Sequence, residues 1–262
     1  MATAALYAFF RTVDDLVDER DPCASLEPIH GQLNMWRDVI VSGRDDASYH
    51  PLLPALQATL ERYAVPRVYL LDLLDGIASD LTPRSIPDFP ALRRYCYQVA
   101  GTVGLAMTSV LGLKHPDGLA HAEALGIAMQ LTNVLRDVGE DLKAGHIYLP
   151  LAELARHHVT EEHLSGAVLD ANFCWFMREQ IARARQYYAY GRHGLHLLEP
   201  DARFPIAVAS VLYEHILTCI ERNNYDVFSR RATTTRRQKL FLVTRAYAVV
   251  RAGPALQPAA AP

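Results

Sequence analysis

Several features that would assign this chain to a common class of protein are scarce or absent. Its 262 residues include only four cysteines, and Cys23, Cys96, Cys174 and Cys219 lie far apart with no CxxC pair. This spacing excludes a zinc ribbon and a small disulfide-linked domain, and it suits the reduced cytoplasm, where we expect the protein to be located. No apolar run reaches the roughly 18 residues that would span a bilayer, so we expect no transmembrane segment.

A strong excess of charge of either sign is also missing. The formal net charge is −3, with 21% charged and 50% hydrophobic residues. We therefore expect no nucleic-acid partner, and the apolar content suffices for a folded core. Basic residues nevertheless crowd into residues 221–251, whose only acids are Glu221 and Asp226. Such a segment could attract the acidic part of the chain over residues 1–80, or it could face a phosphate-bearing substrate or anionic lipid. In the last case the protein would associate peripherally with a membrane.

The alternating pattern of β-strands is absent as well, whereas helical periodicity runs through the whole chain. It predicts helices over residues 2–19, 26–41, 51–63, 67–81, 89–113, 119–144, 170–198, 204–228 and 236–250. Gly145 is expected to end the helix at residue 144. The sequence thus predicts an all-α protein, with one domain over residues 1–251 and a disordered Ala/Pro tail over residues 252–262.

The first candidate site is the segment YAFFRTVDDLVDE at residues 7–19. On a helix, Tyr7, Arg11, Asp14 and Asp18 advance by four, three and four residues, so they share one face. Two carboxylates one turn apart repel each other by roughly 3 kcal/mol at an effective dielectric constant of 20. In water this repulsion shrinks, so the simplest interpretation of the segment alone is a solvated acidic face.

The second candidate site is QLTNVLRDVGEDLKAGHIYLP at residues 130–150. Its polar residues Gln130, Asn133, Asp137 and Asp141 advance by three, four and four residues and again share one helical face. Because the two segments carry the same Asp-xxx-Asp spacing, a shared role in holding a cation is favoured over two solvated faces.

The donor types of both segments indicate which cation they would bind. Carboxylate and amide oxygens suit Mg²⁺ above all, for which Mn²⁺ could substitute. The loop of an EF-hand is not found. A di-iron bundle needs two Glu-xx-His pairs, and the sequence offers only Glu27 and His30, which Pro28 interrupts. Arg11 and Arg136 lie beside the acidic pairs, and guanidinium groups bind phosphate oxygens in a fork, although each arginine could also simply pair with a neighbouring aspartate.

At these residues the chain closely resembles the squalene/phytoene synthase family of head-to-head prenyltransferases, and phytoene synthases of bacteria most of all. YAFFRTVDDLVDE resembles the family's first aspartate-rich motif, while YCYQVAGTVG at residues 95–104 and the segment at 130–150 resemble two further signatures. IERNNYDVFSRR at residues 220–231 is similar to the C-terminal segment of phytoene synthases. The resemblance implies a helical bundle of the isoprenoid synthase type, with an apolar cavity between two facing aspartate motifs.

The resemblance also implies roles for individual residues. Mg²⁺ would be held by Asp14, Asp18, Asn133, Asp137 and Asp141. Diphosphate would be contacted by Tyr7, Arg11, Gln130, Arg136, Tyr225 and Arg230. Tyr95 would line the reaction centre and act in catalysis with the four aspartates. The small residues from Gly101 to Gly104 would either let two helices approach closely or keep a cavity wall open for isoprenoid tails.

The activity implied is the condensation of two molecules of a prenyl diphosphate, geranylgeranyl diphosphate, through a cyclopropylcarbinyl diphosphate to phytoene. One alternative is a synthase of dehydrosqualene or presqualene diphosphate that uses farnesyl diphosphate. Another is a non-catalytic helical scaffold or assembly protein of the same fold. Family members carry a helix and a flap before the first motif, and Tyr7 follows Met1 closely here, so we expect that helix to be missing. The sequence does not predict the oligomeric state.

Overall fold

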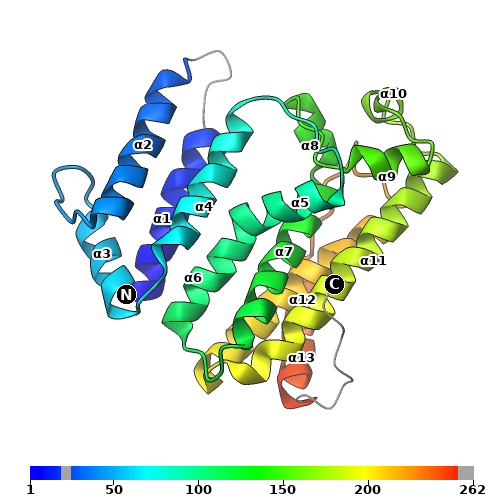
Figure 1. Ribbon diagram of the computed structural model, residues 1–262. Coiled ribbons are helices and arrows are strands. Elements are labelled where there is room, and N and C mark those ends of the chain that lie inside the picture. The colour runs from blue at the N-terminus through cyan, green and yellow to red at the C-terminus, as the bar shows by residue number, and fades with distance from the viewer. Residues whose placement is uncertain (19–24, 253–262) are drawn as a thin grey trace.

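The computed structural model describes residues 1–18 and 25–252 and, within them, contains helices and no strand (Figure 1). The longer helices are α1 (Ala2–Asp18), α2 (Glu27–Ser42), α3 (Leu53–Arg62), α4 (Arg67–Ala78), α5 (Phe89–Cys96), α6 (Thr102–Leu111), α7 (Gly118–Arg136), α11 (Ala171–His193), α12 (Pro200–Arg222) and α13 (Arg236–Ala252). The shorter ones are α8 (Val138–Lys143), α9 (Leu151–Arg156) and α10 (Glu161–Ser165), with single turns at Ser79–Leu81, Tyr97–Gly101 and Gly194–Leu197. The all-α prediction is confirmed, and the predicted tail falls on residues outside the described part, apart from Ala252 at the end of α13.

Two predicted helices are interrupted. The one predicted over residues 89–113 contains a π turn, in which the backbone N–H of Thr102 bonds to the carbonyl of Tyr97, five residues earlier. The one predicted over residues 119–144 breaks at Asp137, whose ψ of 12° departs from helical geometry. Periodicity alone cannot reveal either interruption, because apolar residues continue at helical spacing on both sides.

Other boundaries differ in simpler ways. α12 begins at Pro200 rather than at residue 204, since proline is well tolerated in the first turn of a helix. It ends at Arg222 rather than at residue 228, because Asn224 and Tyr225 adopt positive φ angles. Two short helices, α9 and α10, were not predicted. Gly145 follows the end of α8 with a φ of 83°, which confirms the predicted stop.

The bundle surrounds α7, which packs most extensively against α11 (Figure 1). One group of buried side chains joins α5, α7 and α11, and a second joins α1, α2, α3 and α4. A third, smaller group joins α12 to α13. α12 alone among the described helices is long and apolar enough to cross a membrane by composition. It contacts α7, α11 and α13.

Glycines allow α7 to approach the π turn and α6 closely. A Cβ atom on Gly126 would lie 2.4 Å from the carbonyl oxygen of Ala100, and one on Gly104 would lie 2.7 Å from that of Ala122. No real Cβ atom tolerates such distances, so both positions require glycine. The close-approach interpretation of the small residues around Gly104 is thereby confirmed.

Replacement of Gly126 with alanine should therefore destabilise the protein. We expect Gly126→Ala to lower the free energy of unfolding by about 1–3 kcal/mol, because α7 must move away from Ala100. Gly31→Ala is the matched control, since a Cβ on this helical glycine meets nothing within 4 Å, and it should stabilise by about 0.5–1 kcal/mol. Thermal unfolding followed by circular dichroism measures both, and an unchanged transition for Gly126→Ala would contradict the packing argument.

Candidate active site

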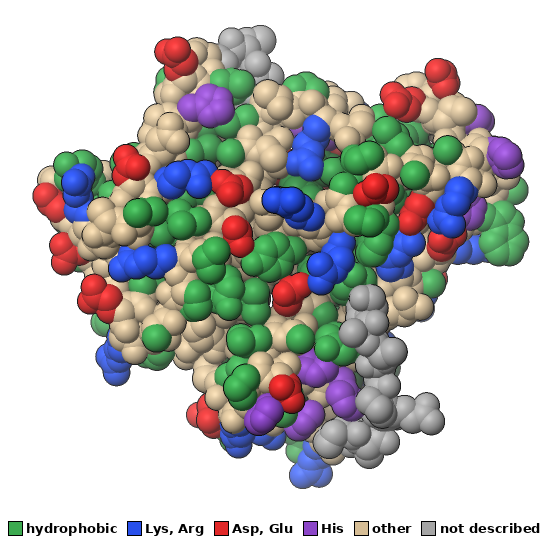
Figure 2. Space-filling model, in the orientation of Figure 1, with side chains coloured by type: hydrophobic (Ala, Val, Ile, Leu, Met, Phe, Trp, Pro, Cys, Tyr) green, Lys and Arg blue, Asp and Glu red, His purple; other side chains and the backbone are tan. Residues whose placement is uncertain are grey.

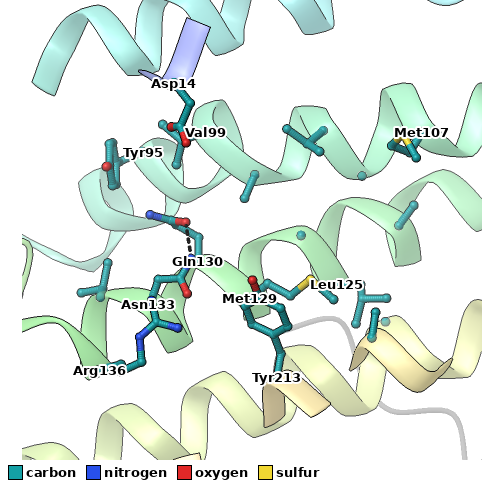
Figure 3. Close-up of a pocket in the computed structure, with 18 of the residues that line it drawn as sticks. Asp14, Tyr95, Val99, Met107, Leu125, Met129, Gln130, Asn133, Arg136 and Tyr213 are labelled. Carbon is teal, nitrogen blue, oxygen red and sulfur yellow. Dashed lines mark hydrogen bonds between the residues drawn. The ribbon is translucent and has the colours of Figure 1, made fainter. Parts of the chain in front are cut away.

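In the described part of the chain, a cavity of about 950 Å³ lies among α1, α4, α6, α7, α8 and α12. Its two ends differ in chemistry. Figure 3 shows Asp14, Gln130, Asn133 and Arg136 gathered toward one end and Met107 and Leu125 toward the other. The apolar end is completed by Leu111, Leu195, Leu198 and Ile206. The cavity therefore has a charged end, called its mouth below, and a hydrocarbon-like interior.

The first acidic segment contributes to the mouth from α1. Asp14 lines the cavity, and Arg11 lies 3.9 Å from its carboxylate and 2.6 Å from that of Asp15. Asp18 is the last residue of α1, and its side chain lies outside the described part of the structure. Tyr7 and Arg11 are exposed and do not line the cavity, so a role for them in binding stays a prediction.

The second acidic segment contributes from α7 and α8. Gln130, Asn133, Asp137 and Asp141 all line the cavity, and the amide of Asn133 donates a hydrogen bond to Gln130 Oε1 at 3.1 Å. Figure 3 shows Gln130 directed toward Asp14 across the open space. The structure thus brings the two segments, about 120 residues apart in the chain, to opposite sides of one chamber.

Asp137 lies between two arginines. Arg136 donates to it in a fork, with N–O distances of 2.7 and 2.5 Å, and Arg231 donates to it at 3.0 and 3.2 Å. Arg231 also lies 3.6 Å from Glu140 and lines the cavity. Sequence reasoning selected the neighbouring Arg230, which is exposed and lies outside the cavity lining.

Gly139 explains how Arg231 reaches Asp137. The chain after α12 crosses α8 so closely that a Cβ on Gly139 would lie 2.9 Å from the carbonyl oxygen of Phe228. The backbone N–H of Gly139 also donates to the carbonyl of Val227 at 3.2 Å. This crossing precedes Arg231, which lines the cavity, so glycine at 139 is a requirement of packing.

Asp80 is a member of the site that sequence reasoning missed. Its carboxylate accepts hydrogen bonds from the hydroxyls of Tyr95 and Tyr148, at 2.8 and 2.7 Å. The two tyrosine rings stack with centroids 4.8 Å apart, and all three residues line the cavity. Burial, followed by the charge of Asp80, raises the pKa of Tyr95 well above its usual value, so its hydroxyl stays protonated at neutral pH. Asp80 therefore fixes the predicted reaction-centre tyrosine in place.

Tyr225 lies away from the cavity. Its hydroxyl accepts a hydrogen bond from Nε of Arg178 at 3.0 Å, and the guanidinium of Arg178 lies over its ring. The positive φ angles of Asn224 and Tyr225 turn the chain sharply at this point. In this conformation Tyr225 does not meet the other predicted diphosphate contacts, and the linear motif could not show which way this turn would direct it.

The electrostatics of the mouth favour a cation. Burial, followed by the carboxylates of Asp137, Asp80 and Glu140, raises the pKa of Asp141 to about 8, which shows that negative charge is crowded here. Asn133 Oδ1 is buried without a hydrogen-bond partner, so it can serve as a ligand. In the described part of the chain, no three Asp, Glu, His or Cys residues lie close enough to hold a metal ion by themselves. The donor set thus fits Mg²⁺, which commonly takes one or two carboxylates and completes its shell with water and substrate phosphate.

Comparison with known proteins agrees with this geometry. The family described as squalene/phytoene synthase matches residues 1–238. The phytoene synthase of Arthrospira platensis is 40% identical over 241 residues, which cover 87% of this chain and 77% of that one. The 15-cis-phytoene synthase of Synechococcus elongatus is 39% identical, covering 90% and 80%. A crystal structure of a dehydrosqualene synthase in complex with ligand superimposes with a TM-score of 0.83 at 28% identity, covering 96% and 87% of the two chains.

Loss of the Asp80 charge should loosen the pair of tyrosines. We expect Asp80→Asn to lower the free energy of unfolding by about 1–3 kcal/mol, because two tyrosine hydroxyls lose a charged acceptor. Differential scanning calorimetry measures the shift in Tm. Asp45→Asn, at an exposed loop position, is the control and should leave Tm unchanged. Identical transitions for both variants would show that Asp80 does not hold the tyrosines.

Proposed function

Because this chain belongs to the squalene/phytoene synthase family, we propose that it is a prenyltransferase that condenses two molecules of geranylgeranyl diphosphate to phytoene, in carotenoid biosynthesis. The observation that carries the proposal is the cavity itself, in which two aspartate-bearing faces meet across the mouth of an apolar chamber. The substrate has the same division, with an anionic diphosphate head group and a long hydrocarbon tail.

The head groups would bind at the polar mouth. Arg136, Arg231 and Lys143 line it and can donate to diphosphate oxygens. Asp14, Asn133, Asp137 and Asp141 would hold Mg²⁺ together with those oxygens. When bound there, the ion would neutralise the charge that develops on the departing diphosphate. Arg136 and Arg231, which pair with Asp137 in this structure, would then be available to the diphosphate.

The apolar interior would control the reaction of the cation. Loss of diphosphate from one substrate gives an allylic cation, and the double bond of the second substrate attacks it, with loss of a proton, to give a cyclopropylcarbinyl diphosphate. Loss of the second diphosphate, rearrangement and loss of another proton complete the product. Met107, Leu125 and Met129 line the interior and exclude water, which would otherwise capture the cation. Tyr95 lines the polar end of the same cavity (Figure 3), where the π face of its ring can stabilise positive charge.

A second candidate is the synthesis of dehydrosqualene from farnesyl diphosphate, which the similarity to a dehydrosqualene synthase structure favours. Greater sequence identity to phytoene synthases favours the twenty-carbon substrate. Product identification after incubation with geranylgeranyl and farnesyl diphosphates, separately and mixed, distinguishes the two. No product from either substrate would instead support the non-catalytic scaffold.

Removal of one charge from either acidic face should abolish activity. We expect Asp14→Asn and Asp137→Asn each to lower kcat by at least about 100-fold, a loss of roughly 2.7 kcal/mol of transition-state stabilisation. Release of pyrophosphate measures the rate. Asp38→Asn, an exposed carboxylate on α2, should keep full activity.

The role of Mg²⁺ is checked in the same assay. Activity should disappear with a chelator, return with Mg²⁺ and return in part with Mn²⁺. If Asp14→Asn and Asp137→Asn keep wild-type rates, or if the chelator has no effect, the assignment of the two faces to a metal-bridged diphosphate is wrong.

A larger side chain in the apolar interior should shift the preference of the enzyme to a shorter substrate. Ala209 lines the cavity from α12, one turn before Tyr213 and one turn after Ile206. We expect Ala209→Phe to lower kcat/KM for geranylgeranyl diphosphate by about tenfold or more relative to farnesyl diphosphate, because the ring fills space that the longer tail needs. Ala155→Phe, at an exposed position on α9, is the control. An equal loss for both chain lengths would show that Ala209 does not border the tail.

A further inference from the structure

The outer side of α13 carries large apolar side chains that no other part of the described structure covers. Leu240, Phe241 and Tyr247 are 74%, 70% and 55% exposed, respectively. Arg237, Leu240, Thr244, Tyr247 and Arg251 follow one another by three or four residues, so they form a single line along the helix. The opposite side of α13 packs through Leu242 and Ala246. α13 thus has large apolar side chains on both sides, but only the inner side has a partner among the described residues.

Charge on this helix is of one sign. Residues 236–252 contain five basic residues and no acidic one. Arg245 lies 4.0 Å from Glu214, whereas Arg236, Arg237 and Lys239 are exposed and have no acidic side chain within salt-bridge distance in the described structure. Elsewhere, on the face seen in Figure 2, acidic and basic side chains are intermixed. α13 therefore differs from that face in combining exposed large apolar groups with positive charge alone.

The start of α12 extends the same surface. Phe204 is 39% exposed, and its ring meets that of Tyr247 edge-on, with centroids 6.4 Å apart. The guanidinium of Arg251 lies 5.4 Å from the centre of the Tyr247 ring. The exposed surface of Phe204, Leu240, Phe241 and Tyr247, flanked by Arg236, Arg237, Lys239 and Arg251, is called the α13 surface below.

We propose that the α13 surface docks on an anionic lipid bilayer. Apolar and aromatic side chains in the middle of a basic helix match the boundary between acyl chains and head groups, while the flanking cations match anionic head groups. A second copy of the chain is a poorer partner, because two such surfaces would repel each other. Nucleic acid is also a poorer partner, because outside its stacked bases it offers no apolar surface to Leu240 and Phe241.

The location of the surface adds a consequence that rests on the proposed function. Leu242 and Ala246 on the inner side of α13 belong to the same buried group as Leu195 and Leu198, which line the apolar end of the cavity. A bilayer on α13 would therefore lie next to the hydrocarbon end of the chamber rather than next to its charged mouth. A water-insoluble product would be formed close to the phase that receives it.

Vesicle sedimentation tests the docking without any substrate, so its outcome is independent of the proposed function. We expect the protein to bind vesicles of equal parts phosphatidylcholine and phosphatidylglycerol, with weaker binding to phosphatidylcholine alone and at high salt. The double variant Leu240→Ser/Phe241→Ser should reduce binding by at least about tenfold. The triple variant Arg236→Gln/Arg237→Gln/Lys239→Gln should reduce it by about 100-fold, at about fivefold for each cation.

Matched controls are available on other surfaces. Val41→Ser and Trp175→Ser remove exposed apolar groups from α2 and α11, and Arg44→Gln/Arg62→Gln removes exposed cations. All should bind as the wild type does. Wild-type binding by the α13 variants would overturn the proposal. Conversion of a wild-type dimer to a monomer by the same α13 variants, without vesicle binding, would overturn it in favour of a second copy on this surface.

A fluorescent probe reports directly whether α13 inserts into the bilayer. It keeps the test decisive even if the double variant fails to fold. Phe241→Trp in a Trp175→Phe background leaves buried Trp36 as the only other tryptophan. Its emission should shift to shorter wavelength when anionic vesicles are added, and brominated acyl chains should quench it. Val41→Trp in the same background should show neither effect. Vesicle binding without a shift at position 241 would overturn the assignment of α13 as the inserted element.

Discussion

The pairing of Asp137 with Arg136 and Arg231 is the interaction on which the polar end of the site depends. Asp137 lies at the break between α7 and α8, where its carboxylate faces the cavity together with that of Asp141. Without nearby cations, two carboxylates this close together in a partly buried place would destabilise the folded protein. The arginines offset it, and one of them is delivered by a segment that must cross α8 at Gly139. The helix break at Asp137, the glycine at 139 and the basic C-terminal segment therefore act together to place two arginines beside Asp137.

The apolar end depends on a different constraint, the close approach of α7 to α6 and to the π turn. Gly104 and Gly126 have no side chain at the points where the backbones meet. The helices can therefore approach closely at these points and still leave a chamber beside them. The π turn contributes Val99 and Ala100 to its wall. The same short signature, YCYQVAGTVG, thus supplies both Tyr95 at the polar end and part of the hydrocarbon wall.

Helical spacing was enough to predict that the polar residues of each acidic segment share one face of a helix. Five of these residues line the cavity: Asp14, Gln130, Asn133, Asp137 and Asp141. Asp80 and Arg231 could not be found in this way, because their partners Tyr148 and Asp137 lie far away in the sequence. Tyr225 shows the opposite failure, since its motif was visible but the left-handed turn that directs it toward Arg178 was not. Local periodicity predicts faces of helices, whereas loop geometry and long-range pairs decide which side chains meet.

The energetic cost of the site argues against a purely structural role for this fold. A raised pKa means that the ionised form of Asp141 is destabilised in the folded state. Asn133 Oδ1 is buried without the hydrogen bond that buried polar atoms ordinarily have. A scaffold protein would gain stability if apolar residues of similar size replaced these groups. Their presence together, beside Asp14 and at the mouth of a large apolar chamber, is explained when a cation and an anionic substrate complete the interactions that the protein leaves unmade.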